Sequence, residues 1–272
     1  MKSPALVLWL FLPFWLQAAD DTSEPPGRTA PELEAKAAVA IDAITGQELF
    51  AKNPTEKRPV ASTQKLLTAL LVAEAGNLNE PVTVEASDTD VIPVIVGLKA
   101  GETYVKRHLL EALLIKSGND LAMTLGRSNA GSIEAFADRM NRRARQLHAW
   151  SSNFVNPSGL PAENQYSTAR DMSRIARAVY FDPLLRDIIN TRRSMFKRQD
   201  GIDLAMVNTN KLLGESEWVN GMKTGYTNAA GLCLISSGRR NGREVICVVL
   251  GSTSAEIWND SRNLLEWSLS LP

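Results

Sequence analysis

Three short polar motifs combine the residue types needed to activate a serine and to hold a carboxylate. The first is Ser62-Thr63-Gln64-Lys65, in which the serine and the lysine stand three positions apart. If this segment opens a helix, both side chains lie on one face and Lys65 reaches the Ser62 hydroxyl. A lysine acts as a base only when burial or a neighbouring cation lowers its pKa. The motif therefore predicts Ser62 as a nucleophile and Lys65, in its neutral form, as the base.

The other two motifs supply groups that can surround such a serine. Ser117-Gly118-Asn119 stands between two apolar helical segments, where a tight break can direct both polar side chains into a cleft. Lys223-Thr224-Gly225 lies in a predicted strand, where Lys223 and Gly225 share one face and Thr224 takes the other. Gly225 lets a ligand approach the backbone, and a charged Lys223 with a hydroxyl group suits a substrate carboxylate. Taken singly, the motifs also fit a helix cap and an edge-strand lysine.

Each of the first two patterns recurs elsewhere in the chain. Ser194-Met195-Phe196-Lys197 repeats the serine-lysine spacing, but charged clusters flank it and no apolar helix follows. We interpret it as a surface segment. Ser151-Ser152-Asn153 and Ser261-Arg262-Asn263 repeat the second pattern, yet only the copy at Ser117 stands at a break between two helices.

Apolar periodicity predicts the elements that position the motifs. Residues 62–75 form a helix with Ser62 as its N-cap, a leucine stripe along one face and Gly76 as its end. Residues 107–115 form a second helix, and Asn119 caps a short third one at 120–125. The remaining patterns predict a hairpin of 37–43 with 48–52, helices at 132–147, 168–180 and from 182, strands at 222–226, 232–237 and 244–251, and a final helix capped by 253–256.

This order of elements favours an α/β fold with a mostly antiparallel sheet flanked by helices and an inserted all-helical subdomain. The sheet part would comprise about residues 35–85 and 205–272, and the helical part about 86–204. Since the motifs come from both parts, we expect the site in a cleft between them.

Length and charge limit the class of protein. The 272 residues are 44% hydrophobic and 22% charged, which is enough for a sizeable core. Thirty Lys and Arg balance thirty Asp and Glu, so the chain has no basic field with which to hold nucleic acid. A small uncharged or zwitterionic substrate fits this balance better than a polyanion.

The N-terminus reads as a targeting segment. Lys2 precedes an apolar run at Ala5–Leu16, and small residues follow at Ala18 and Ala19. The run is too short for a comfortable membrane span, so we predict a signal peptide at 1–19, a disordered linker at 20–34 and a catalytic domain at 35–272. No stable membrane anchor is expected after cleavage, although an uncleaved anchor is the alternative.

Cysteines and histidines give no sign of a metal or a cofactor. A two-residue turn at Asn241-Gly242 would set Cys247 opposite Ser236 and Cys233 opposite Leu250, with the two thiols on opposite faces of the sheet. We therefore expect two buried free thiols. His108 and His148 have no acidic or cysteine partner at metal-ligand spacing, so we expect both to be structural or surface residues.

Together, the three motifs resemble those of the penicillin-binding DD-peptidases, in particular the low-molecular-mass D-alanyl-D-alanine carboxypeptidases. Other segments that look like the family are 156–160, 166–169, 208–210 and 221–227, and the resemblance covers roughly residues 37 to 269. The best-known members carry a C-terminal β-rich domain and a basic amphipathic anchor, whereas the present sequence runs to Pro272, just after the last expected helix. This short form, with Asn228-Ala229-Ala230-Gly231 after the third motif, is also similar to the murein DD-endopeptidases.

The resemblance implies a role for each motif residue. Ser62 attacks the D-Ala-D-Ala carbonyl, Lys65 takes its proton, Ser117 relays that proton to the leaving amine, and Asn119 orients the substrate amide. Lys223 and Thr224 hold the terminal carboxylate beside Gly225, and the backbone N–H groups of Ser62 and Tyr226 form the oxyanion hole. The ligands would be peptidoglycan stem peptides, with β-lactams as covalent inhibitors, and the place of action would be the periplasm.

Four alternatives remain open at this point. An endopeptidase would release the D-centre of a crosslinked diaminopimelate instead of D-Ala. A class A β-lactamase needs a deacylating glutamate in a Glu-x-x-Leu-Asn segment, and none of Glu134, Glu163, Glu215 and Glu217 lies in one. A histidine-dependent hydrolase is disfavoured because no Gly-x-Ser-x-Gly occurs. A β-lactam sensor would be acylated without turnover, usually behind transmembrane helices.

Overall fold

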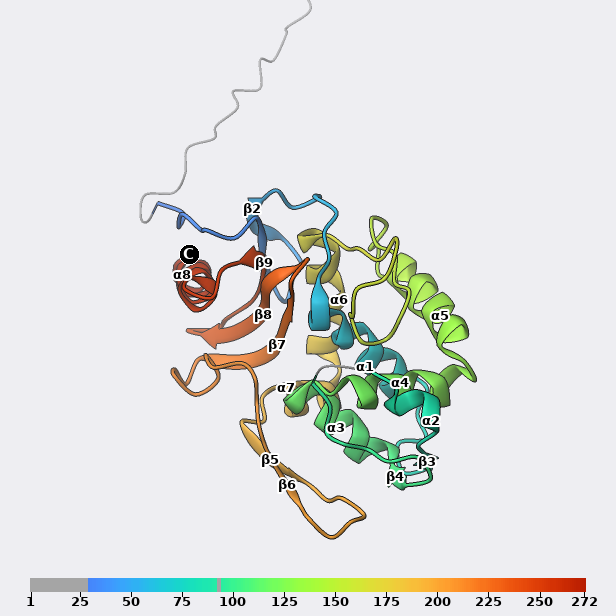
Figure 1. Cartoon of the computed structure of the whole chain (residues 1–272). Helices are drawn as coiled ribbons and strands as arrows, with labels where there is room; N and C mark the ends of the chain where they lie inside the picture. The colour runs from blue at the N-terminus through green and yellow to red at the C-terminus, as the bar shows by residue number, and fades with distance from the viewer. Residues whose placement is uncertain (1–28, 92–93) are drawn as a thin grey trace, which may run out of the picture.

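The site is carried on a five-stranded antiparallel sheet in which the N-terminal hairpin pairs with the C-terminal strands. The computed structural model describes residues 29–91 and 94–272, so the expected signal peptide and residues 20–28 of the expected linker lie outside the described residues. The strand order is β2-β1-β9-β8-β7 (Figure 1). The strands are β1 Ala37–Asp42, β2 Glu48–Lys52, β7 Val219–Thr227, β8 Gly231–Arg240 and β9 Arg243–Ser252.

Helices cover both faces of this sheet. The C-terminal helix α8 (Ile257–Ser270) packs on β8 and β9 on one face, and α6 (Ala169–Phe181) packs on β9 and β1 on the other (Figure 1). Strand β9 lies between β1 and β8, so almost all of its residues are buried, as expected for a central strand with both faces covered. The predicted class, an α/β fold with an antiparallel sheet flanked by helices, is confirmed.

The β8–β9 hairpin has the predicted two-residue turn, and the two cysteines are buried free thiols, as predicted. Asn241 and Gly242 have φ values of +51° and +84°, the left-handed pair that a two-residue hairpin turn requires. Cys247 pairs with Ser236 as predicted, but a bulge between Leu232 and Leu234 interrupts the register around Cys233. The thiols are free and lie in separate apolar clusters on opposite faces of the sheet. Burial raises the pKa of Cys233 to about 11 and that of Cys247 to about 12.

The remaining helices form a layer beside the sheet (Figure 1). At its centre, α1 packs against α3, α4, α5 and α6. The sequence division placed α1 in the sheet part, whereas its contacts place it in the helical layer. The helices of the layer are α1 Lys65–Glu74, α2 Ala86–Thr89, α3 Lys106–Lys116, α4 Asn119–Ala130, α5 Ile133–Gln146 and α7 Pro183–Ile189, with a short 3₁₀ helix at Ala61–Gln64 before α1.

The middle of the chain is not all helical, which corrects the sequence prediction. Strand β3 (Pro81–Thr83) pairs with β4 (Thr103–Val105), and β5 (Arg193–Phe196) pairs with β6 (Leu204–Val207) in a hairpin that projects from the body (Figure 1). These strands have three or four residues each, too few for an alternating pattern to stand out from its surroundings.

Side-chain caps begin three helices where the sequence indicated. Ser132 accepts a hydrogen bond from Ala135 N at 3.1 Å, and Thr168 and Asp182 accept from the third residue after each. Thr168 and Asp171 form only half of a capping box, because the Asp171 carboxylate accepts from Ser151 N and Ser152 Oγ. The final helix α8 has no side-chain cap; the Thr253 carbonyl accepts from the backbone N–H groups that open it.

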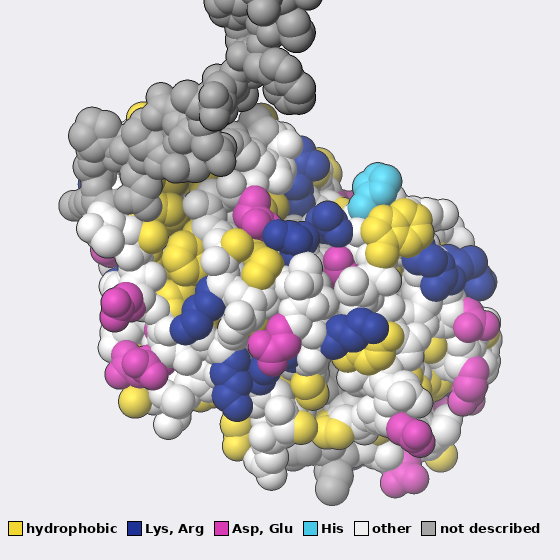
Figure 2. All heavy atoms as spheres, turned by 90° about the horizontal axis from the view of Figure 1, so that it is seen from above, with side chains coloured by type: hydrophobic (Ala, Val, Ile, Leu, Met, Phe, Trp, Pro, Cys, Tyr) yellow, Lys and Arg dark blue, Asp and Glu magenta, His cyan; other side chains and the backbone are white. Residues whose placement is uncertain are grey.

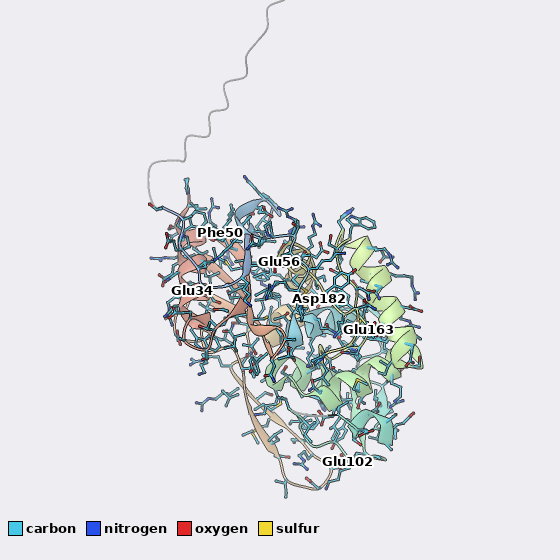
Figure 3. The ribbon with its side chains drawn as sticks, turned by 45° about the horizontal axis from the view of Figure 1, so that its top comes forward. Glu34, Phe50, Glu56, Glu102, Glu163 and Asp182 are labelled. Atoms are coloured by element: carbon cyan, nitrogen blue, oxygen red, sulfur yellow. The ribbon has the colours of Figure 1, made fainter. Side chains whose placement is uncertain are left out.

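The folded chain begins before residue 35. The Leu33 side chain is buried, and the backbone N–H of Glu34 donates to Asp260 Oδ1 of α8 at 2.9 Å (Figure 3). The Lys52 ammonium donates to the Leu33 carbonyl. Leu33 and Glu34 were expected in the linker, but these contacts assign both to the domain.

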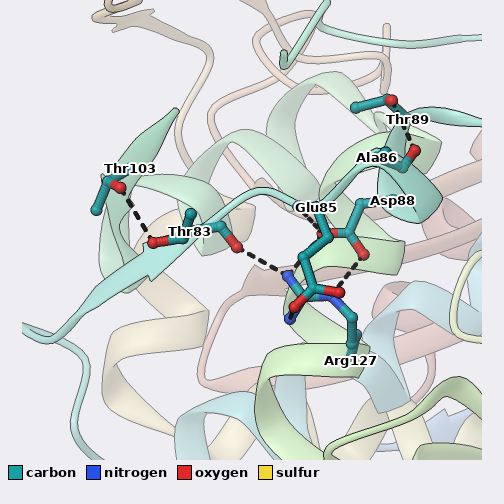
Figure 4. A network of polar contacts seen from close by, with 7 residues as sticks. All are labelled: Thr83, Glu85, Ala86, Asp88, Thr89, Thr103 and Arg127. Carbon is teal, nitrogen blue, oxygen red and sulfur yellow. Dashed lines mark hydrogen bonds and ion pairs between the residues drawn. The ribbon is translucent and has the colours of Figure 1, made fainter. Parts of the chain in front are cut away.

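Helix α4, which begins at the second motif, is fixed at its far end by an ionic network (Figure 4). The Arg127 guanidinium donates to Asp88 at 2.7 and 2.8 Å, to Glu85 at 2.7 Å and to the Thr83 carbonyl at 2.8 Å. Glu85 and Asp88 also form the capping box of α2. Across residues 29–91 and 94–272, we find no helix with the length and apolarity needed to span a membrane.

Candidate active site

Ser62 lies in the short 3₁₀ turn Ala61–Gln64 that leads into α1. The sequence predicted Ser62 as the N-cap of one helix, but the structure shows no side-chain cap either there or at the start of α1. Thr63 is the residue that bonds back to the turn, through its hydroxyl to the Val60 carbonyl at 2.6 Å. The Ser62 hydroxyl is therefore not occupied in capping.

Lys65 is fully buried, and its amine lies between three oxygen atoms. Lys65 Nζ is 2.8 Å from Ser62 Oγ, 2.7 Å from Asn119 Oδ1 and 2.7 Å from the carbonyl oxygen of Ser158. The amide and backbone carbonyl oxygens can only accept, whereas the serine hydroxyl can also donate. A neutral amine with its two N–H bonds on those acceptors therefore directs its lone pair at the Ser62 hydroxyl.

The surroundings of Lys65 favour that neutral form. Burial lowers the pKa of Lys65 well below its usual value, and the positive charge of Lys223 lowers it further. The negative charge of Asp120 acts in the opposite direction and raises the pKa. The net effect is a lowered pKa, which the predicted role of Lys65 as a base requires.

The second motif forms the predicted break between α3 and α4. Ser117 ends α3 in the left-handed conformation, with φ +70°, and both Ser117 and Asn119 are buried. The sequence predicted Asn119 as a cap of a helix at 120–125. Instead, Gly118 is the N-cap, Asn119 is the first residue of a longer helix, and its side chain turns to Lys65. The Asn119 amide oxygen thus accepts a hydrogen bond from Lys65 and does not cap the helix.

The third motif brings a second buried lysine to the site. Lys223 Nζ donates to Ser117 Oγ at 2.8 Å and to the Thr224 carbonyl at 3.0 Å, which leaves one of its three N–H bonds for a ligand. Burial lowers the pKa of Lys223 to about 7. We expected this lysine to stay charged, but its charge in the free protein depends on pH near neutrality.

The rest of the third motif lies against the nucleophile. Strand β7 is an edge strand of the sheet and packs against the 3₁₀ turn of Ser62. A Cβ atom added to Gly225 would lie 2.9 Å from Ser62 N, so only glycine permits this approach. Thr224 Oγ1 donates to Thr209 Oγ1 at 2.6 Å, and the Tyr226 side chain is 61% exposed at the rim.

The loop 156–160, to which the sequence assigned no role, clamps the start of α1. Its carbonyl groups accept from three side chains of the first motif and α1: Asn156 O from Gln64, Pro157 O from Thr68, and Ser158 O from Lys65. Gly159 has φ +84°, and a Cβ there would lie 2.1 Å from the Ala61 carbonyl oxygen. The loop therefore fixes the Lys65 amine from the side opposite Asn119.

Asp120 is a buried carboxylate that sequence reasoning passed over. It accepts backbone hydrogen bonds at 2.9 to 3.2 Å from Val96, Gly97, Leu98 and Leu121. Its neighbour Asn119 donates its backbone N–H to the Val94 carbonyl at 2.8 Å. Asn119 and Asp120 thus hold residues 94–98 in place. The only sign of this role in the sequence was an aspartate directly after the second motif.

The repeated patterns do not build a second site of this kind. Ser194 lies on strand β5, not on a helix, and its hydroxyl donates to Glu111. Residues three apart on a strand point to opposite faces, so this serine has no lysine partner at Lys197. Ser152 bonds to Asp171 and Ser167, and Ser261 is buried within α8.

A buried lysine on a serine hydroxyl, with a second buried lysine whose charge acts on the first, is the arrangement of a serine hydrolase of the Ser-Lys type. The comparisons agree: the D-alanyl-D-alanine carboxypeptidase family (peptidase S11) matches residues 23–254. The chain therefore belongs to this family and is a serine-type DD-peptidase, which confirms the resemblance seen in the motifs.

Individual relatives extend this match over nearly the whole chain. D-alanyl-D-alanine carboxypeptidase DacB2 of Mycobacterium tuberculosis is 34% identical over 260 residues, covering 93% of this chain and 89% of that protein. The D-alanyl-D-alanine endopeptidase of Escherichia coli is 32% identical over 250 residues, with 90% and 80% covered. A crystal structure of the D-alanyl-D-alanine carboxypeptidase from M. tuberculosis superposes with a TM-score of 0.86 at 32% identity, covering 91% of this chain and 95% of that one.

The hydrogen-bond partners of Ser62 can be compared with those that a class A β-lactamase needs. Within the described residues, the hydrogen-bond partners of Ser62 Oγ are Lys65 and the Ser158 carbonyl, and none is a carboxylate. Glu163, on the loop that follows residue 160, is exposed (Figure 3). The geometry thus lacks the glutamate beside the serine that a class A β-lactamase uses for deacylation.

Proposed function

We propose that Ser62 is the acylated nucleophile and Lys65 its base. The Ser62 hydroxyl gives its proton to Lys65 Nζ while its oxygen attacks the carbonyl carbon between the two D-Ala residues. The observation that carries this step is the buried amine 2.8 Å from Ser62 Oγ with two carbonyl acceptors on its other side. The tetrahedral intermediate collapses to a Ser62 ester, and the amine of the leaving group takes up a proton.

The proton can reach the leaving amine along the cleft. Ser117 accepts a hydrogen bond from Lys223, so its own O–H is available as a donor toward the leaving group. We propose that Ser117 passes a proton to the amine and that Asn119, held by Lys65, orients the substrate amide. Water then attacks the ester, with Lys65 again as base, and restores the Ser62 hydroxyl.

The substrate would be positioned by its charge and by the edge of the sheet. The free N–H of Lys223 is suited to the terminal carboxylate. The Thr224 hydroxyl donates to Thr209 at 2.6 Å, so it would have to turn from Thr209 to donate to the same carboxylate. The close approach of Gly225 to Ser62 N supports an oxyanion hole made by the backbone N–H groups of Ser62 and Tyr226. A β-lactam carries a carboxylate and a strained amide, so it should acylate Ser62 in the same way.

The reaction we propose is removal of the terminal D-Ala from peptidoglycan stem peptides. Cleavage of D-Ala-diaminopimelate crosslinks is the second candidate, favoured by the 32% identity with the endopeptidase of E. coli. Both reactions have the same acyl-enzyme and differ in the leaving amine. Digestion of purified crosslinked peptidoglycan, with the products identified, distinguishes them: release of D-Ala indicates a carboxypeptidase, and conversion of dimers to monomers an endopeptidase. If wild-type protein yields neither product, or Ser62→Ala yields the same products, the proposal fails.

We further propose that the enzyme is exported by the segment 1–19 and works in the periplasm, where its substrate lies. Cell fractionation and N-terminal sequencing of the mature protein test this directly. Recovery only in detergent extracts, with residues 1–19 intact, would show that the segment is an anchor.

A further inference from the structure

A hollow lies away from the three motifs, between the β1–β2 hairpin, the end of α5 and one side of α6. This cavity has a volume of about 670 Å³. Its lining includes three arginines of α6 together with Glu48, His148 and Ser173, and none of these residues belongs to the three motifs. We call it the arginine hollow, after Arg170, Arg174 and Arg177.

The three guanidinium groups are held in place by the protein and retain free donors. They stand at positions i, i+4 and i+7 of α6, on one face of the helix. Arg170 donates to Glu48 through Nε and Nη2, Arg174 to the His148 carbonyl and Asp171 through Nη1, and Arg177 to the Ala43 and Ile44 carbonyls through Nε and Nη2. Among the described residues, Arg170 Nη1, Arg174 Nη2 and Arg177 Nη1 have no hydrogen-bond partner, although the Arg177 guanidinium also lies over the Phe181 ring.

The charge of the hollow is positive although the chain as a whole is neutral. Of the described residues that line it, three are arginines and one, Glu48, is a carboxylate; with the Asp171 carboxylate that pairs with Arg174, the net charge is +1 before His148 is counted. Figure 2 shows one face of the molecule, on which a histidine side chain lies near several Lys and Arg side chains. Pre-positioned guanidinium groups in a concave surface recognise carboxylates by paired hydrogen bonds.

An exposed tryptophan stands at the edge of the hollow. Trp150 is 64% exposed, and its ring meets the ring of His148 edge-on at 6.0 Å between centroids. A large aromatic ring left in water beside a polar cavity is suited to contact with an amphipathic ligand. Sugar rings present an apolar C–H face and polar edges, and therefore fit such a ring.

We propose that the arginine hollow is a second binding site for the peptidoglycan strand, with the arginines on stem-peptide carboxylates and Trp150 on a sugar ring. The inference rests on the proposed function, because the ligand is the polymer that carries the substrate. A polymer that bears both carboxylates and sugars matches both halves of this surface. Binding there would hold the enzyme on the wall while one stem peptide after another enters the cleft.

The test measures binding with the cleft closed. The full-length enzyme is first acylated with penicillin, and its Kd for insoluble purified peptidoglycan is then determined by co-sedimentation. We expect Arg174→Ala and Trp150→Ala each to weaken binding at least about tenfold, and Arg174→Lys to recover part of the loss. Methyl esterification of the peptidoglycan carboxylates should remove the difference between wild type and Arg174→Ala, but not the effect of Trp150→Ala.

Arg107→Ala is the matched control, because Arg107 is an exposed arginine on α3, outside the hollow. Equal binding by wild type and the two hollow variants, or an equal loss in Arg107→Ala, overturns the inference. Hydrolysis of a soluble D-Ala-D-Ala peptide should stay unchanged in all variants, since none of them touches the cleft. Absence of that hydrolysis in the wild type refutes the proposed function, independently of the binding result.

Discussion

Lys65 Nζ lies 2.8 Å from Ser62 Oγ, and the Ser158 carbonyl and Asn119 Oδ1 each lie 2.7 Å from the same amine. Two of its three neighbours can only accept hydrogen bonds, so the neutral amine has a single arrangement, with its lone pair toward Ser62. The site thereby orients the base as well as lowering its pKa. The predictions below follow from this arrangement and from the residues that enforce it.

The two lysines should not be interchangeable. Lys65→Arg should reduce acylation by penicillin at least about 100-fold, because a guanidinium cannot give up its proton in a protein. Lys223→Arg keeps its charge and should retain measurable acylation, with its loss mainly in capture of substrate. Second-order acylation rates with one penicillin, on variants shown to be folded, decide the matter. If Lys65→Arg acylates as fast as Lys223→Arg, Lys65 is not the base and Ser117 is the next candidate.

The pH dependence of kcat/KM should separate the roles of the lysines. Protonation of Lys65 stops catalysis at low pH. At the other end, the pKa of Lys223 is lowered to about 7 by burial, so kcat/KM for a peptide with a free carboxylate should fall as pH rises through about 7. Lys223→Arg should lack this alkaline limb, since guanidinium stays charged. An identical alkaline limb in both proteins would assign it to another group.

The contact between Gly225 and the nucleophile turn should be intolerant of a methyl group. Gly225→Ala places a Cβ 2.9 Å from Ser62 N and should lower the acylation rate about 100-fold by displacing an oxyanion donor. Gly238→Ala on β8 is the control, because its Cβ would meet the Trp218 carbonyl oxygen at 3.0 Å, a similar crowding away from the site. Equal losses of acylation in the two variants would show general destabilisation instead.

Asp120 should act on the reaction through its neighbours. Asp120→Asn places an NH₂ group against backbone donors at Val96, Gly97 and Leu98, so it should lower the melting temperature and slow acylation about tenfold. Because the negative charge of Asp120 raises the pKa of Lys65, its removal should move the acid limb of kcat/KM to lower pH. Asp88→Asn, which removes a buried carboxylate partner of Arg127, is the control and should leave that limb in place. An acid limb that also stays in place in Asp120→Asn would confine Asp120 to a structural role.

Much of this arrangement was predictable because local patterns specify it. The leucine stripe of α1, the caps at Ser132, Thr168 and Asp182 and the Asn241-Gly242 turn depend on neighbouring residues alone. The three motifs likewise contain residues whose side chains meet in the structure: Lys65 with Ser62 and Asn119, and Lys223 with Ser117.

The features that could not be predicted from the sequence mostly depend on contacts between distant segments. Asn119 was expected as a cap, but Lys65, 54 residues earlier, takes its side chain. The Ser158 carbonyl reaches Lys65 through the backbone, for which residue type gives little signal. Strand β3 pairs with β4 across the intervening helix α2, and β5 and β6 have only four residues each, so the sequence pattern of these strands was too short to predict them.

The central claim is that Ser62 carries the acyl group, and the most direct measurement is mass mapping of the penicillin adduct. Wild-type enzyme is incubated with a penicillin, digested with a protease and examined for the peptide that carries the added mass. We predict a single adduct on Ser62, unchanged labelling in Ser194→Ala and no labelling in Ser62→Ala. An adduct on Ser194, or undiminished labelling of Ser62→Ala, would contradict it.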